Sequence, residues 1–311
     1  MLTENRHPIL TVTPNPAYDV TYVVPRIDLG AVHRVAEVRE RAGGKGINVA
    51  RVLGQLGVRA HALGFGDNAF AMALRDDGID HDLVEALPRV RRTLVVRAED
   101  TTSFWEPGAT LADGAEDELC RRVEERLTDA RGVVVSGSLP SGADPGLPAR
   151  LARLAVAAGV PVVVDTHGEP LRRAAQVPGV VLMPNTDELA DLATDADDWK
   201  TACDSLVAAG VRAVVATHGA DGMSAVAQDA SWHASPPERI AGNPTGAGDA
   251  AAAATIAHLS GGHPDWPALL AEAVATSGAA VTMPAAGEID HATRERLRPY
   301  VTVRRDEELQ P

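Results

Sequence analysis

The sequence predicts an α/β protein with a mainly parallel β-sheet and a second, smaller β-sheet. From about residue 131 onward, short valine-rich runs alternate with helical segments, an order typical of a parallel sheet covered on both faces. The strand-like runs of the first 110 residues instead alternate apolar and polar residues, as half-exposed strands do. We therefore expect a single domain over 1–311, with a β lid contributed by about 12–40 and 88–110.

Composition narrows the class of protein. The 311 residues are 45% hydrophobic and 23% charged, an ordinary globular balance. The net charge of −14, without any basic stripe, argues against a nucleic-acid partner. No uninterrupted apolar run reaches the ~18 residues of a membrane span, and no signal peptide is visible. The two cysteines lack metal-binding spacing, so we expect a cytoplasmic protein.

The N-terminal part predicts one core strand at Leu10–Thr13 and a projecting small sheet. The small sheet takes its strands from the alternating runs Val20–Val24, Arg34–Arg39 and Thr93–Arg97. A lid can exclude water from a site when it closes, and its exposed edge allows a homodimer. Phe104-Trp105 has three open interpretations, namely a cap over the substrate, a dimer contact or ordinary packing.

A glycine-rich turn at residues 42–51 leads into a helix. Val49, Val52, Leu53 and Leu56 recur at helical spacing, and Gly57 is a plausible C-cap. Lys45 lies in this turn, and the chain has only one other lysine, Lys200. A compact ammonium is not interchangeable with a guanidinium, so Lys45 is a candidate functional residue rather than only a solvated loop lysine.

The central part predicts strands whose carboxyl ends carry polar residues. The strands are Val133–Val135, Pro161–Asp165, Val180–Met183 and Ala213–Ala216, and the helices run from Pro148 to about Ala158, from near Asp187, and over Trp199–Ala209. Ligands of parallel sheets bind beyond the carboxyl ends of the strands. The residues at those ends are Ser138, Asp165, Asn185 and Thr217.

The segment 242–254 is the most informative one. Its Gly-Ala-Gly turn and Asp249 precede a run of five alanines, which predicts a helix. Helix N-termini carry unpaired amides and a partial positive charge, and a turn without bulky side chains lets an anion approach. Asp249 beside that anion is placed to take a proton from a hydroxyl. The pattern indicates phosphoryl transfer to an alcohol. An ordinary glycine turn before a core helix has the same sequence pattern and stays an alternative.

Four ordered motifs resemble the signatures of ribokinase/PfkB-type carbohydrate kinases over nearly the whole chain. They lie at residues 15–19, 43–51, 136–140 and 243–249. The first two point to the branch of 1-phosphofructokinase and tagatose-6-phosphate kinase. The resemblance implies a ribokinase-like three-layer α/β/α domain with a small β lid, and an ATP- and Mg²⁺-dependent kinase that converts a ketohexose phosphate into a bisphosphate.

The resemblance also implies residue roles. Asp249 is the expected base, and the backbone amides of Gly246, Ala247 and Gly248 are the expected anion hole. The expected substrate-binding residues are Asp19, Arg34, Gly43, Gly44, Lys45, Asn48, Arg91 and Ser138, with Arg92 a close rival of Arg91. The expected nucleotide-binding residues are Asn185, Thr217, Gly219, Gly222, Ser277 and Gly278, the last two in an adenine loop. Glu188 is expected to organise Mg²⁺ through water, although Asn185 and Glu188 also fit a helix cap.

Three positions depart from the family pattern. Met183 stands where relatives usually have a lysine near the nucleotide, and His218 where a leucine is common. Trp105 replaces an asparagine in a loop near the sugar. The identity of the phosphosugar, the accepting hydroxyl and any monovalent-cation dependence therefore stay open.

Other functions give alternatives. A ribokinase-type kinase of unphosphorylated sugars or nucleosides would not need Arg34, Lys45 and Arg91 together. A catalytically inactive sugar- or nucleotide-binding protein is disfavoured by the intact Gly246–Asp249 segment. A dinucleotide-dependent oxidoreductase lacks the expected Gly-x-Gly-x-x-Gly after the first strand.

Overall fold

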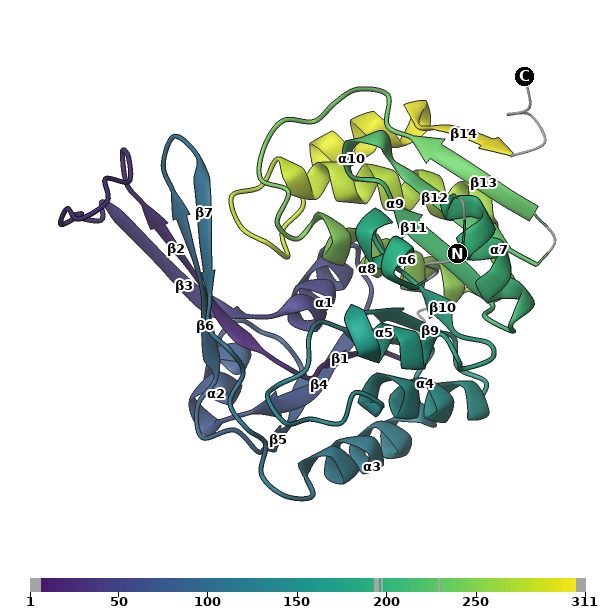
Figure 1. The fold of residues 1–311 in the computed structure, drawn as a ribbon, viewed down its shortest axis with the longest axis horizontal. Helices are drawn as coiled ribbons and strands as arrows, with labels where there is room; N and C mark the ends of the chain where they lie inside the picture. Colours follow the sequence, from purple (N-terminus) through teal and green to yellow (C-terminus); the bar gives the residue numbers. More distant parts are fainter. Residues whose placement is uncertain (1–6, 193–195, 197, 229, 306–311) are drawn as a thin grey trace.

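The computed structural model describes residues 7–192, 196, 198–228 and 230–305. Two separate β-sheets organise it (Figure 1). The large sheet has ten strands, in the order β14 (Thr302–Arg305), β13 (Ala230–Ser235), β12 (Met223–Ala227), β11 (Ala213–Thr217), β10 (Val181–Leu182), β9 (Val162–Asp165), β8 (Gly132–Ser136), β1 (Ile9–Thr13), β4 (Ala60–Gly66) and β5 (His81–Glu85). Strands β11 to β5 are parallel and β12 to β14 antiparallel, which confirms the predicted mainly parallel sheet.

Helices cover both faces of this sheet, because neighbouring strand residues point to opposite sides. Ile9 packs into the apolar cluster that includes α1 (Lys45–Gln55), α8 (Ala247–Leu259) and α9 (Trp266–Val281). Leu10 packs into the opposite cluster. The helices of that cluster are α2 (Asn68–Asp76), α3 (Ala115–Leu127), α4 (Leu147–Ala157), α5 (Gly168–Ala174), α6 (Thr186–Leu192) and α7 (Trp199–Ala208). The expected three-layer α/β/α arrangement is confirmed.

The remaining helical segments lie near the C-terminus and in one turn. Helix α10 (His291–Leu297) packs on α9 and is followed by the short 3₁₀ segment η2 (Arg298–Tyr300), while η1 (Gly219–Asp221) follows β11. In the described part of the chain, no helix is both long and apolar enough to cross a membrane.

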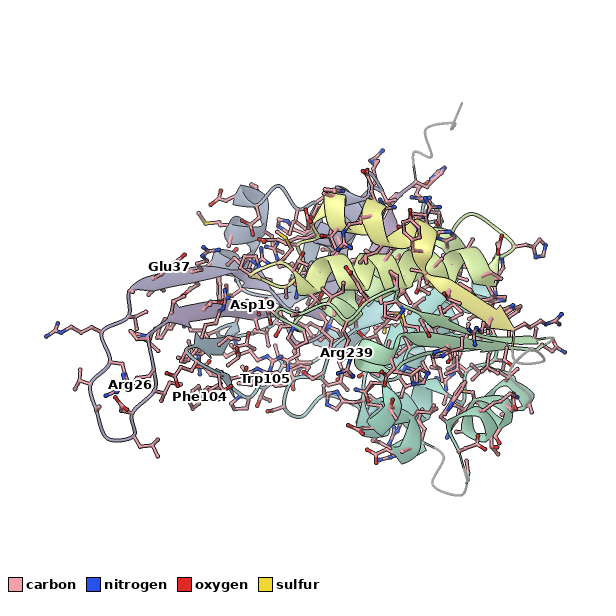
Figure 2. The ribbon with its side chains drawn as sticks, turned by 90° about the horizontal axis from the view of Figure 1, so that it is seen from above. Asp19, Arg26, Glu37, Phe104, Trp105 and Arg239 are labelled. Atoms are coloured by element: carbon pink, nitrogen blue, oxygen red, sulfur yellow. The ribbon has the colours of Figure 1, made fainter. Side chains whose placement is uncertain are left out.

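The small sheet projects from the side of the large domain (Figure 1). Its strands, in spatial order, are β3 (Glu37–Gly43), β2 (Ala17–Val23), β6 (Arg91–Arg97) and β7 (Thr101–Trp105). Figure 2 shows Asp19 where this sheet meets the large domain and Arg26 at its far end. The strand predicted at Arg34–Arg39 begins three residues further along, at Glu37, and ends four further, at Gly43, because pairing with β2 begins where Val23 faces Glu37.

Candidate active site

The turn before α8 requires glycine. Gly246 has a left-handed conformation with φ 89°, and a Cβ there would lie 2.7 Å from Cα of Ala286. Next to Gly248, by contrast, nothing lies within 4 Å of the position a Cβ would take, so that side of the turn is open. The amide of Ala247 donates to the carbonyl of Pro244 at 3.1 Å and closes the turn. The turn thus leaves space at the amino end of α8, where partial positive charge favours an anion.

Asp249 lies at this end of α8 and is 5% exposed. The side-chain amide of Asn48, on α1, donates to its Oδ2 at 3.0 Å. Burial raises the pKa of Asp249 to about 7, and the positive charge of Lys45 opposes that rise. A carboxyl group whose pKa is near neutral gains and releases a proton readily at that pH, which suits a general base.

Lys45, at the start of α1, is held over the carboxyl ends of two core strands. Its Nζ lies 3.0 Å from Oδ1 of Asp165, at the end of β9. Ser136, at the end of β8, donates to the other oxygen of Asp165 at 2.8 Å. The carboxylate of Asp165 raises the pKa of Lys45, so the ammonium stays charged. Asp165 was predicted as one of the polar strand-end residues near a ligand, and the structure adds its pairing with Lys45.

Asp19 lies where the small sheet joins the large domain. It sits on β2, opposite Arg41 on β3 and Thr93 on β6. The hydroxyl of Thr93 donates to its Oδ1 at 2.7 Å. A Cβ at Gly43 would lie 2.1 Å from the other carboxylate oxygen, so this position must be glycine for Asp19 to keep its place.

Gly44 completes the turn into α1. It has φ 104°, which only glycine adopts without strain. A Cβ there would also lie 3.1 Å from Cα of Pro16. The close approach brings the Asn-Pro-Ala segment before β2 against the start of α1.

Arg91, at the start of β6, is directed toward Asn15 and Ser138. Its guanidinium donates to the carbonyls of Glu106 (3.1 Å) and Asn15 (3.4 Å) and lies 3.5 Å from Oγ of Ser138. Its Nε is buried without a hydrogen-bond partner. Arg92 points elsewhere, with its guanidinium 5.7 Å from the ring centre of Tyr18. The structure therefore brings together Arg91 and Ser138, whereas Arg34 lies exposed in the segment before β3.

Asn185 and Glu188 form a reciprocal cap at the start of α6. The amide of Asn185 donates to Glu188 at 2.9 Å, and the amide of Glu188 donates to Asn185 at 2.8 Å. Asn185 also forms a β-bridge with Thr217 at the end of β11. The cap role anticipated from the sequence is thus present. It leaves carboxylate oxygen at the strand ends, the ligand type that Mg²⁺ prefers together with water and phosphate.

The turn after β11 contains two glycines in positive-φ conformations. Gly219 has φ 59°, and Gly222 has φ 106° with a hypothetical Cβ only 1.9 Å from the carbonyl oxygen of Ala234. Ser277 and Gly278 do not lie in a loop as expected, but within helix α9. Gly278 is there because a Cβ would come within 3.0 Å of Leu297 on α10, so its small size is explained by helix packing.

The largest of the cavities described, about 820 Å³, lies elsewhere. It is bounded by the end of α1, the start of β4 and the end of α2. Arginines and carboxylates line it together, among them Arg41, Arg51, Asp77 and Glu288. None of the predicted site residues line this cavity.

Comparison with known proteins identifies a matching family and similar proteins. The model of the pfkB family of carbohydrate kinases matches residues 15–292. A 1-phosphofructokinase of Xanthomonas campestris is 36% identical over 265 residues, covering 80% of this chain and 83% of that protein.

Solved structures agree with that match. Phosphofructokinase-2 of Escherichia coli, in complex with potassium, superposes with a TM-score of 0.88 at 27% identity, covering 94% of this chain and 99% of that one. The same enzyme in complex with fructose-6-phosphate gives 0.82 at 26% identity, with the same coverage.

Proposed function

Because this chain belongs to the pfkB family of carbohydrate kinases, we propose that it transfers the terminal phosphoryl group of ATP to a hydroxyl of a ketohexose phosphate. The product is a bisphosphate. The observation that carries the proposal is Asp249, a buried carboxyl with a pKa of about 7 at the amino end of α8, beside an open glycine turn. The similarity to a 1-phosphofructokinase supports the substrate class.

The transfer needs a base and an anion site close together. Asp249 takes the proton of the attacking hydroxyl, while Asn48 holds its carboxylate in place. The amides at the start of α8, from Gly246 to Gly248, stabilise the charge of the migrating phosphoryl group. Lys45, charged and 3.0 Å from Asp165, adds a cation at the same edge of the sheet.

Residues at the root of the small sheet hold the acceptor. Asp19, fixed by Thr93, accepts hydrogen bonds from sugar hydroxyls. Arg91 and Ser138 bind the phosphate that the sugar already carries, because a guanidinium matches phosphate with forked hydrogen bonds. The buried, unpaired Nε of Arg91 gives this arginine a donor still to be satisfied.

The strand ends on the other side hold the nucleotide. Thr217, Gly219 and Gly222 line the turn where ATP phosphates approach. Asn185 and Glu188 would hold Mg²⁺ through water, and the ion when bound would neutralise phosphate charge. Ser277, on α9, is a further nucleotide-binding residue. We place the enzyme in the cytoplasm as a homodimer that pairs through the small sheet, whose strand β7 is exposed throughout.

A single screen tests the proposal. ATP turnover is measured with fructose 1-phosphate, tagatose 6-phosphate, fructose, ribose and a nucleoside, in the presence of Mg²⁺. We expect the highest kcat/KM with a ketohexose phosphate. A higher value with an unphosphorylated sugar or a nucleoside would assign the chain to a ribokinase-type activity instead, and no turnover with any of them would indicate a binding protein.

A further inference from the structure

Two histidines and a serine form a hydrogen-bonded group behind the nucleotide-side turn. Ser224, fully buried on β12, lies 3.0 Å from Nε2 of His218 and 2.9 Å from Nδ1 of His233. Nδ1 of His218 in turn lies 3.3 Å from the hydroxyl of Thr186, the residue next to Asn185. The catalytic roles described above use none of these side chains.

His218 also closes the turn through its backbone. Its amide donates to the carbonyl of Gly222 at 2.9 Å, and its own carbonyl accepts from Asp221 at 3.1 Å. Its ring packs edge-on against Trp199 of α7, with ring centres 5.2 Å apart. One residue thus joins the glycine turn to α6, α7 and β12.

Only one order of protons satisfies every contact with both histidines neutral. The hydroxyl of Thr186 reaches the carbonyl of Thr217 at 3.3 Å, and a carbonyl can only accept. Thr186 therefore donates there and accepts from Nδ1–H of His218. The bare Nε2 of His218 then accepts from Ser224, which accepts from Nδ1–H of His233.

The surroundings favour this neutral state. Burial lowers the pKa of His218, a positive charge on His233 would lower it further, and Asp221 opposes the shift. These are the titratable groups facing its ring from β13 and η1, whereas Thr186, Trp199 and Ser224 face it without charge.

We propose that His218 is a positioning residue for nucleotide binding, which fixes the Gly219–Gly222 turn through a one-directional hydrogen-bond chain from β13 to α6. The inference rests on the proposed ATP-dependent activity, because it assigns the turn to ATP. Since Thr186 donates to Thr217, the chain also ties α6, with Asn185, to the end of β11. The distance between the two nucleotide-side elements is therefore set from behind the site.

The kinetic test compares three variants with the native enzyme. In His218→Leu, both ring hydrogen bonds are lost and Ser224 loses a partner, so we expect the KM for ATP to rise about five- to ten-fold. Ser224→Ala keeps His218 but cuts the chain, and should raise it roughly two- to five-fold. His263→Leu, at an exposed histidine, is the matched control and should change nothing.

Which kinetic constants change decides whether His218 positions the nucleotide site. We expect kcat and the KM for the phosphosugar to change less than about two-fold in each variant, because the chain does not contact the acceptor side. An unchanged KM for ATP in His218→Leu would overturn the inference. So would a rise in both KM values together with a fall in kcat by the same factor. Absence of ATP turnover in the native enzyme would instead contradict the proposed function.

A spectroscopic measurement tests the chain without any nucleotide. Nitrogen-15 NMR of the histidine rings at neutral pH should show His218 as a neutral ring with its proton on Nδ1, and His233 with a proton on Nδ1, assigned by their loss in single variants. A proton on Nε2 of His218, or a charged ring, would contradict the proton order.

Discussion

The two sheets differ in how firmly they hold the residues assigned to the site. At the edge of the large sheet, Asp249 and Asp165 are 5% and 7% exposed and each accepts a side-chain hydrogen bond. In the small sheet, every residue of β7 is exposed, and so are the first four residues of β3. At its root, Asp19 and Arg91 are held by side-chain hydrogen bonds. The charged groups are thus placed by the core, whereas the outer strand of the small sheet is free for contact.

The largest effect should come from the base at the buried edge. Asp249→Asn keeps the side-chain shape but cannot take a proton, so we expect turnover to fall about a hundred-fold or more. Binding of ATP, measured by calorimetry, should stay near the native value. Full turnover in this variant would show that the rigid region does not supply the base.

The root of the small sheet should give the next largest effect. Arg91→Lys loses the forked geometry, so we expect the KM for the phosphosugar to rise about ten-fold or more. Arg92→Lys, one residue along and directed to Tyr18, is the matched control. Equal effects of the two substitutions would mean that the root does not bind the substrate phosphate.

The Lys45–Asp165 pair allows the pH dependence of the site to be tested. Turnover should rise as the pH increases through about 7, where Asp249 ionises. Because the charge of Lys45 lowers the pKa of Asp249, Lys45→Gln should move this rise to higher pH. The pH profile of kcat measures both, and a profile that keeps its position in the variant would contradict the coupling.

The same carboxyl group, Asp249, should make the free energy of unfolding fall as the pH rises. Folded Asp249 keeps its proton up to a pH of about 7, whereas the unfolded chain releases it near 4. The unfolded state therefore binds fewer protons between these values, and the native protein loses stability as the pH rises through them. Urea unfolding at several pH values should show this loss in the native protein and a smaller one in Asp249→Asn.

The smallest effect on catalysis should come from the exposed edge of the lid. Phe104 and Trp105 are 57% and 73% exposed (Figure 2). Replacing Phe104 by serine should leave the fold unchanged, because the side chain contributes little to the core. If the small sheet pairs two copies, light scattering will show a lower mass for this variant. An unchanged dimeric mass would place the contact elsewhere.

The sequence predicted the central strands because each is a short, continuous apolar run. It did not predict β4, β12 or β13, in which glycine, alanine, serine and histidine interrupt the pattern. Gly64 of β4, for example, lies where a Cβ would be 2.2 Å from the carbonyl oxygen of Thr13. Close strand contact, rather than hydrophobicity, selected that residue.

The site residues were predictable where a motif fixes local geometry, as at Gly43, Gly44 and Gly246. The pairing of Lys45 with Asp165 was not, because 120 positions separate them and only the fold brings them together. Ser277 and Gly278 were assigned to a loop because the family resemblance implies an adenine loop there, whereas they lie within α9. This helix packs against α10, a contact between distant segments that the local sequence does not reveal.

The bond between Asn48 and Asp249 joins helices whose residues are 201 positions apart. During synthesis on the ribosome, α1 emerges early and α8 only near the end. A nascent or truncated chain can therefore present Lys45 and Asn48 while it still lacks the proton acceptor. We expect such a chain not to consume ATP, because phosphoryl transfer requires α8 to have docked against α1.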